Sequence, residues 1–354
     1  MKISIHKHLL HFKKPSGTSR GVLYDKPSWI LTIEDKKGIK GTGEFSVIPG
    51  LSPDFIDEET YEYEINRLID FLNDLFLSSS AIEQIIEQVK FQFLQFPSLI
   101  FGVETALLDY SNGGKEIIFK NEFSFGQTSI PINGLIWMET KENMKAQIEE
   151  KLNLGFKTIK LKIGAISIQD ELALIEQIRN DYSAEDITIR VDANGAFNPI
   201  EARNILTELR KLNVHSIEQP IAAGNWNEMK MLCNENIIPI ALDEELIGIY
   251  SKESKIQLFN NIKPQFIILK PSLHGGFSGC AEWIELAEER KIGWWITSAL
   301  ESSIGLNAIA QFTANYPVTL PQGLGTGGLY TNNLPTNLVI EQGYLKLKQD
   351  AIKS

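Results

Sequence analysis

The sequence predicts an α/β protein, in which a barrel of parallel β-strands and α-helices follows a smaller N-terminal α+β domain. Two observations support this prediction. From about residue 130 onward, short apolar segments alternate with amphipathic helical segments, the pattern of a parallel sheet buried on both faces. Five of the apolar segments end in a charged residue, at intervals of 30, 26, 25 and 27 residues. Each interval is about the length of one strand plus one helix, as in a β/α barrel.

The N-terminal domain is expected over residues 1–125. β-rich composition indicates strands over 1–12 and 28–35, and turn-forming residues indicate a loop over 14–21. The segment 41–54 contains three glycines and two prolines and is expected to be irregular. Helical periodicity of apolar residues predicts helices over about 57–76, 80–91 and 98–112.

The barrel is expected over residues 126–329. Seven strands are predicted at 132–136, 158–162, 187–192, 216–218, 239–243, 266–270 and 293–297. Helices are predicted at about 140–153, 169–181 and 199–212. An eighth strand at 320–324 is the weakest of the set. The segment from about 330 to 354 leaves the alternating pattern and is expected to pack back on the N-terminal domain and complete it.

Three carboxylates, Asp192, Glu218 and Asp243, end three consecutive predicted strands. One acid at a strand end is often a helix cap or an ion-pair partner. Neighbouring strands lie only about 4.8 Å apart, so three acids at matching ends can converge, and a cation between them would offset their repulsion. Oxygen ligands without His or Cys indicate Mg²⁺, with Mn²⁺ as a substitute, rather than zinc.

Three lysines accompany the acids. Lys160 and Lys162 are two residues apart on one strand, so both side chains point the same way, into the mouth of the barrel. Like charges lower the pKa of neighbouring ammonium groups, which favours a lysine that acts as a base. Lys270 would face Lys162 across the metal. The alternatives are solvated lysines on an edge strand and a lysine that extends from a strand end to water.

The bulk composition excludes several classes of partner. A net charge of −11 argues against nucleic acid or an anionic membrane surface. We expect a cytoplasmic protein, because no apolar run approaches the ~20 residues of a membrane span and the first residues alternate as in a strand, unlike a signal peptide. Cys233 and Cys280 lack metal or redox spacing and are expected to be reduced and buried. The oligomeric state stays open, a homo-oligomer included.

The chain resembles the muconate-lactonizing branch of the enolase superfamily over its whole length. The resemblance rests on five short segments in order: Lys160-Leu161-Lys162, Val191-Asp192-Ala193-Asn194-Gly195, Ile217-Glu218-Gln219-Pro220, Ala241-Leu242-Asp243-Glu244 and Leu269-Lys270-Pro271. It implies a modified TIM barrel, (β/α)7β, with an N-terminal α+β capping domain. It also implies a small-molecule carboxylate as substrate, with Mg²⁺ held by Asp192, Glu218 and Asp243.

Within that branch the chain is most similar to the o-succinylbenzoate synthases of menaquinone biosynthesis, on the segments 270–273, 297–302 and 323–327. The resemblance implies syn dehydration of a succinyl-hydroxycyclohexadiene carboxylate through an enediolate. Lys162 would be the base and Lys270 an opposing cation, with Lys160 beside them. The implied supporting residues are Asn194 and Glu244 around the metal ligands and Arg20, Ser298, Ser302 and Gly325 at the substrate.

Rival functions stay open at this stage. Dipeptide epimerases and N-acylamino acid racemases belong to the same branch and would use both lysines as bases. The epimerase pattern carries an Asp-x-Asp motif on the last barrel strand, and the segment 323–328 here has no acid. Muconate cycloisomerase is a further member of the branch. A non-catalytic binding barrel is opposed by the intact set of three acids and three lysines.

Overall fold

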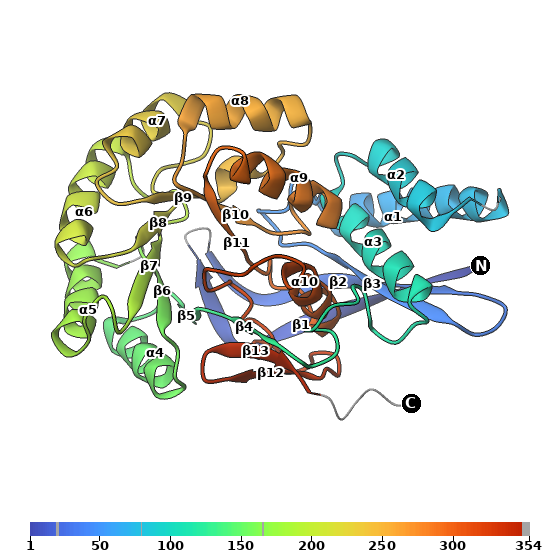
Figure 1. Cartoon of the computed structure of the whole chain (residues 1–354), viewed down its shortest axis with the longest axis horizontal. Helices are drawn as coiled ribbons and strands as arrows, with labels where there is room; N and C mark the ends of the chain where they lie inside the picture. Colours follow the sequence, from blue (N-terminus) through green and yellow to red (C-terminus); the bar gives the residue numbers. More distant parts are fainter. Residues whose placement is uncertain (19–20, 79, 165, 349–354) are drawn as a thin grey trace.

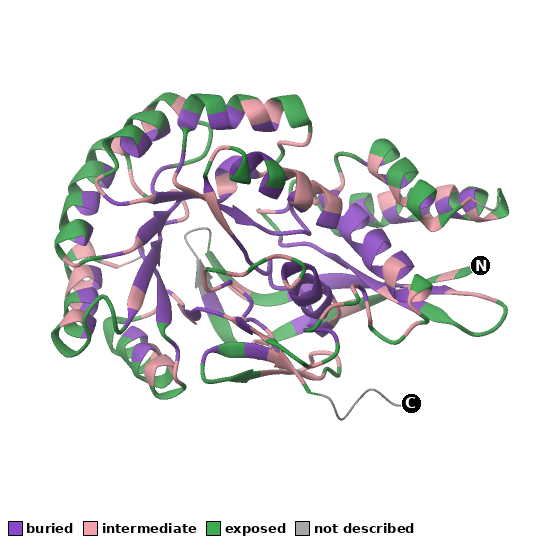
Figure 2. Ribbon diagram, viewed as in Figure 1, coloured by how far each residue is buried: buried purple, intermediate pink, exposed green. Residues whose placement is uncertain are grey.

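The computed structural model of the protein describes residues 1–18, 21–78, 80–164 and 166–348. It places the N-terminal domain beside a curled parallel sheet that is lined on its outer side by an arc of helices (Figure 1). Buried residues face the interior of both parts, and exposed residues follow the outer sides of the helices (Figure 2). None of the helices among the described residues has both the length and the apolar content of a membrane span.

The N-terminal domain is a three-stranded antiparallel sheet that packs against helices. The strands are β1 (Lys2–Thr18), β2 (Gly21–Glu34) and β3 (Lys40–Ser46), in that spatial order. The helices are α1 (Glu58–Leu77), α2 (Ile82–Gln92) and α3 (Pro97–Ser111). Their apolar faces share one core with the sheet. The predicted helices therefore agree with the structure to within about two residues.

The loop predicted over 14–21 is wrong within the described residues, because β1 continues to Thr18 and β2 begins at Gly21. The turn-forming residues mark an irregularity instead: the register of β1 against β2 shifts between His11 and Ser16. There, Lys13 donates its backbone N–H to the carbonyl of Leu329, 2.8 Å away. This long-range pairing holds the chain extended where composition favoured a turn.

The irregular segment predicted over 41–54 is also wrong in its first part, which is strand β3. Its glycines allow α3 to lie directly on the sheet. A Cβ atom at Gly43 would stand 2.0 Å from the carbonyl oxygen of Gly102, and one at Gly41 would stand 2.0 Å from that of Ala106. The glycines therefore permit a close approach of helix to strand.

The barrel is a seven-stranded parallel sheet in the spatial order β11-β10-β9-β8-β7-β6-β5. Its strands are β5 (Gly134–Ile136), β6 (Thr158–Lys162), β7 (Thr188–Asp192), β8 (Ser216–Glu218), β9 (Ile240–Leu242), β10 (Phe266–Leu269) and β11 (Gly293–Ile296). The connecting helices are α4 (Lys141–Asn153), α5 (Ile168–Asp181), α6 (Pro199–Lys211), α7 (Trp226–Glu235), α8 (Lys252–Ile262), α9 (Gly276–Glu288) and α10 (Ser303–Thr313), with a 3-10 turn, η1 (Glu244–Leu246). The alternation of the sequence thus predicted all seven strands.

Local capping explains where several barrel helices begin. Thr140, Ser167, Asn198, Ser251 and Ser302 each have extended backbone and a side-chain oxygen that accepts an N–H from the first turn of the helix that follows. Such residues satisfy backbone donors that have no partner within the helix.

The eighth strand forms only as isolated bridges. Gln322 pairs with Ile132, and Gly323 pairs with Thr297, both in parallel orientation. These two bridges join the edge of the sheet at β11 to the start of the barrel, so the predicted segment 320–324 lies where it was expected. It is too short and too rich in glycine and proline to form a regular strand.

The C-terminal segment contacts both domains. Residues 330–331 pair with β1 through a bridge between Phe12 and Tyr330 and a bond from the Thr331 N–H to the His11 carbonyl. Beyond them, β12 (Leu338–Glu341) and β13 (Tyr344–Leu347) form a separate sheet with β4 (Ser129–Pro131). These strands pack with the barrel core through Leu345. The expected packing on the N-terminal domain therefore describes only the first part of this segment.

Candidate active site

The strand-end residues of the sequence lie in register at one edge of the barrel sheet. Lys162 pairs directly with Asp192 across β6 and β7, and Asp192 pairs with Glu218 across β7 and β8. Parallel strands present their C-terminal ends at the same edge, so consecutive strand ends bring these side chains together. Asp243 and Lys270 follow immediately after β9 and β10.

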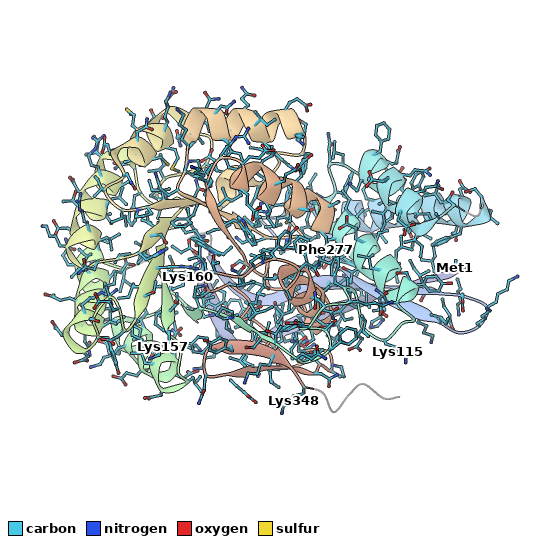
Figure 3. The ribbon with its side chains drawn as sticks, in the orientation of Figure 1. Met1, Lys115, Lys157, Lys160, Phe277 and Lys348 are labelled. Atoms are coloured by element: carbon cyan, nitrogen blue, oxygen red, sulfur yellow. The ribbon has the colours of Figure 1, made fainter. Side chains whose placement is uncertain are left out.

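One cavity of about 170 Å³ collects these residues. Its walls come from the N-terminal domain, from the strand ends and from the last segments of the barrel. The lining residues are Gly21, Val22, Leu23, Ile48, Pro49, Leu51, Asn133, Leu135, Trp137, Lys160, Lys162, Asp192, Asn194, Glu218, Asp243, Lys270, Thr297, Ser298, Ala299, Leu300, Gly323, Gly325 and Thr326. The labelled Lys160 lies on the inner side of the arc of helices (Figure 3).

The first two lysines contact the acids of β7 and β8. The Nζ atom of Lys160 lies 2.9 Å from Asp192 Oδ2 and 2.5 Å from Glu218 Oε2. The Nζ atom of Lys162 lies 3.0 Å from the same oxygen of Asp192 and donates to Asn194 Oδ1 at 2.6 Å. Asn194 in turn donates from Nδ2 to Glu244 Oε1 at 3.0 Å. Both lysines therefore face the acids, as residues two apart on one strand should.

Lys270 lies across the barrel from Lys162. Three strands, β7, β8 and β9, separate β6 from β10 in the sheet, and both lysines line the same cavity. The ammonium group of Lys270 forms an ion pair with Asp243. Its backbone N–H donates to Nδ1 of the buried His274 at 2.9 Å. Burial lowers the pKa of His274 to about 3, so this imidazole is neutral and can accept the bond.

The pKa values of the three acids shift in different directions. Burial acts to raise the pKa of Asp192, but Lys160 and Lys162 outweigh it and hold that pKa well below its usual range. Lys270 likewise outweighs burial at Asp243 and lowers its pKa. At Glu218, burial and then the charge of Asp192 raise the pKa well above its usual value. Of the three acids, Glu218 is therefore the one whose ionisation its surroundings oppose most.

The pKa of Lys160 runs opposite to the sequence-based expectation. Burial acts to lower the pKa of Lys160, but Asp192 and Glu218 outweigh it, and the net shift is upward. The pKa of Lys270 is also raised, because Asp243 and Glu218 outweigh its burial. The expectation counted the neighbouring ammonium and omitted the carboxylates, which lie at hydrogen-bond distance.

The cluster offers oxygen ligands of the kind that bind a divalent cation, but the lysines now occupy part of them. Glu218 Oε1 and Asp243 Oδ1 are buried and accept no hydrogen bond, which is costly for a carboxylate. As the side chains stand, no three carboxylate, imidazole or thiol groups in the described residues are grouped closely enough to hold an ion. The ammonium groups of Lys160 and Lys270 lie against the acids instead. A bound cation would have to displace part of these contacts.

Only some of the residues predicted to contact the substrate line the cavity. Ser298 and Gly325 line the cavity. Ser302 does not, so its prediction as a substrate contact is corrected: its hydroxyl donates to Glu44 Oε2 at 2.6 Å and caps α10. Arg20 lies outside the described residues. Glu244 does not line the cavity and reaches the site through Asn194.

One residue that organises the site, Gln219, was given no role by sequence reasoning. It accepts the N–H of Asp243 at 3.2 Å and has a left-handed backbone, with φ of 40°. Asn194, which the resemblance implied as a supporting residue, also has positive φ, at 43°. Such conformations are uncommon for residues other than glycine and cluster at functional sites. Asp243 lies more than twenty residues from Gln219 in the sequence, so no local pattern could have identified this contact.

Comparison with known proteins agrees with this arrangement. The family model of the enolase C-terminal domain-like proteins matches residues 143–351, more than half of the chain. The chain is 48% identical to the o-succinylbenzoate synthase of Desulfotalea psychrophila over 367 residues, covering 98% of each protein. It is 25% identical to the N-succinyl-L-Arg/Lys racemase of Bacillus cereus, covering 87% of this chain and 83% of that protein.

A solved structure shows the same fold. The crystal structure of MenC from Desulfotalea psychrophila superimposes with a TM-score of 0.84 at 44% identity, covering 98% of this chain and 99% of that one. The parallel barrel, the N-terminal domain and the full-length similarity lead to one assignment. The chain belongs to the enolase superfamily, in its muconate-lactonizing branch.

Proposed function

We propose that this protein is an o-succinylbenzoate synthase, which removes water from 2-succinyl-6-hydroxy-2,4-cyclohexadiene-1-carboxylate to form o-succinylbenzoate. The observation that carries the proposal is a single cavity lined by three lysines and three acids in a chain 48% identical, over its full length, to a protein of that name. We further propose that the reaction belongs to menaquinone biosynthesis and takes place in the cytoplasm.

We propose that Asp192, Glu218 and Asp243 hold Mg²⁺, with Mn²⁺ as a substitute. All three offer oxygen ligands, and two of them have an oxygen without a partner. When bound, the ion supplies positive charge for the negative charge that develops on the substrate carboxylate as the α-proton leaves.

The charge of the cavity supports an anionic substrate. In the structure, the three carboxylates lie against the side-chain nitrogens of Lys160, Lys162 and Lys270. With Lys162 neutral, as a base must be, the two other lysines and a divalent cation would exceed the three carboxylates by one positive charge. A carboxylate of the substrate would offset this charge. The proposed substrate carries a ring carboxylate and a succinyl carboxylate.

Lys162 is the base in this proposal. Its Nζ takes the proton from the carbon that bears the ring carboxylate, and the electron pair of that C–H bond moves toward the carboxylate to give an enediolate. The C–O bond of the β-hydroxyl then breaks, the ring becomes aromatic, and Lys162 returns its proton to the departing oxygen, which leaves as water. Use of one side chain for both steps requires the proton and the hydroxyl to leave from the same face.

The other two lysines stay charged. Their raised pKa values come from the acids that they contact. Lys270, across the cavity from Lys162, would stabilise the enediolate from the opposite face. Lys160 bridges Asp192 and Glu218 and would hold these carboxylates in place. A lysine that stays protonated throughout the reaction can stabilise negative charge without taking part in proton transfer.

The remaining walls would contact the succinyl group. The N-terminal domain contributes apolar residues, among them Leu23, Ile48 and Leu51, and the barrel contributes the hydroxyl of Ser298. A cavity that is apolar with a few polar groups is typical of small-molecule sites. Such walls would enclose the methylene carbons of the tail.

A second candidate function is racemisation of an N-succinyl amino acid. It is favoured by the placement of Lys162 and Lys270 on opposite sides of the cavity, because racemisation needs a base on one face and an acid on the other. A dipeptide epimerase is less favoured, because the described lining residues include no carboxylate besides Asp192, Glu218 and Asp243. An acid would be needed to bind the ammonium group of a dipeptide.

Paired assays would test the proposal. The protein is incubated with the cyclohexadiene carboxylate and, separately, with N-succinyl amino acids, each with Mg²⁺ and after chelation with EDTA. We expect metal-dependent formation of o-succinylbenzoate. Racemisation without dehydration would transfer the assignment to the second candidate, and dehydration unaffected by EDTA would exclude the proposed metal.

A further inference from the structure

A buried carboxylate that contacts no catalytic group organises one wall of the cavity. Glu301 is fully buried. Its Oε1 atom accepts a hydrogen bond from Ser272 Oγ at 2.5 Å, and its Oε2 atom accepts one from Ser298 Oγ at 2.6 Å. One side chain thus joins the segment after β10 to the segment after β11.

The hydrogen bonds of Ser298 make its orientation depend on Glu301. Its hydroxyl donates to Glu301 and accepts from Thr326 Oγ1 at 2.8 Å and from the Leu300 N–H at 2.9 Å. A hydroxyl has one hydrogen, so the bond to Glu301 decides which way that hydrogen points. Ser298, Leu300 and Thr326 all line the cavity.

The same segment contains backbone strain. Leu300 has a φ of 62°, in the left-handed region that few residues other than glycine adopt. Such a conformation persists only where its surroundings hold it. Here Ser298 Oγ accepts the Leu300 N–H, and the Tyr330 hydroxyl donates to the Leu300 carbonyl at 2.6 Å.

One partner of Glu301 is close in the chain to Lys270, the lysine across the cavity. Ser272 lies two residues after Lys270, and it is fully buried. Glu301 therefore anchors the short segment that carries Lys270 to the segment that carries Ser298. A carboxylate is costly to bury, and two hydroxyl donors offset part of that cost.

We propose that Glu301 is a positioning residue for the dehydration: through Ser298 and Ser272 it fixes the cavity wall and the segment that carries Lys270. This inference rests on the proposed function. Glu301 need not touch the substrate, since its two contacts transmit its effect.

Steady-state kinetics of Glu301→Gln would test the proposal. The amide can accept only one of the two hydroxyl bonds, so we expect kcat/KM to fall roughly tenfold, the scale of one lost bond to a charged group. The matched control is Glu104→Gln. Glu104 is a buried carboxylate that accepts the backbone N–H of Phe277 at 2.5 Å and does not line the cavity. We expect this control to change kcat/KM by less than about twofold.

A double-mutant cycle separates positioning from general damage. If Glu301 acts through Ser298, Glu301→Gln should cost much less in a Ser298→Ala background than in the wild-type protein. Additive losses in the cycle, or a normal kcat/KM in Glu301→Gln, would overturn the proposal.

Amide hydrogen exchange provides a readout that needs no activity. Glu301→Gln should speed exchange within 271–274 and 298–302, and Glu104→Gln should not. Wild-type exchange rates in Glu301→Gln would overturn the inference even if the protein proved not to dehydrate this substrate, so the two failures are distinguishable. If Glu301→Gln does not fold, Ser272→Ala and Ser298→Ala remove the same bonds from their other ends and are expected to speed exchange in the same segments.

Discussion

Replacement of Lys162 by alanine is the sharpest test of the proposed chemistry. The substitution removes the one group that the mechanism uses both to take the α-proton and to return it. It leaves Asp192 paired, because the Nζ atom of Lys160 still lies 2.9 Å from Asp192 Oδ2. The variant should therefore fold, and its loss of activity should report on chemistry.

The expected magnitudes for stability and for catalysis are different. For stability, Asn194 Oδ1 loses its 2.6 Å bond to Lys162, a cost of about 1 kcal/mol. For catalysis, a positioned base contributes about 10²–10⁴ in rate, and Lys162 would act in two steps, so kcat should fall by at least about 10³, or roughly 4 kcal/mol. The catalytic effect should thus exceed the effect on stability several-fold.

The assay is formation of o-succinylbenzoate at saturating Mg²⁺, with urea unfolding of the same samples. Lys255→Ala is the matched control, since Lys255 is a buried lysine that bonds Glu282 Oε2 at 2.6 Å on the outer side of the barrel. The control should lose stability and keep its kcat within about twofold. A Lys162→Ala protein with kcat within tenfold of wild type would refute the assignment of Lys162 as the base.

Three further predictions concern the metal and two buried contacts of α3. Addition of Mg²⁺ to EDTA-treated protein should stabilise it by about 2.7 kcal/mol at a hundredfold excess over Kd, and Asp243→Asn should remove most of this gain; an unchanged thermal midpoint in the wild type would contradict the metal site. Burial raises the pKa of Glu104 to about 7 from 4.5, so its contribution to folding is complete below about pH 4.5 and is lost as the pH rises through 7. The unfolding free energy of the wild-type protein should therefore fall between pH 4.5 and pH 8, and in Glu104→Gln this fall should be smaller by about 3 kcal/mol. An equal fall in both proteins would contradict the raised pKa of Glu104. Gly43→Ala should cost about 3 kcal/mol through the contact with Gly102, whereas Gly328→Ala, where a Cβ atom meets nothing within 4 Å, should cost little; equal losses would disprove the steric explanation.

The two wrong secondary-structure predictions share one physical cause. Composition indicated a loop at 14–18 and an irregular chain at 41–46, yet both segments are strands. In the first, Lys13 pairs with Leu329, more than three hundred residues away in the sequence. In the second, the glycines admit the backbone of α3. Turn propensity depends only on a residue and its neighbours in the sequence. The contacts that hold these two segments extended come from residues far away in the sequence, and they outweigh the local propensity.

The sequence by itself determined the parallel barrel and the edge at which its charged residues meet, because apolar periodicity and strand-end spacing are local properties that parallel strands convert into a shared edge. Only the tertiary structure decided which groups touch: the ammonium of Lys160 between two acids, the hydroxyl of Ser302 on Glu44 and the carboxylate of Glu301 between two serines. These contacts join segments from different strands and domains, and their distances depend on how the sheet curls and where the N-terminal domain lies.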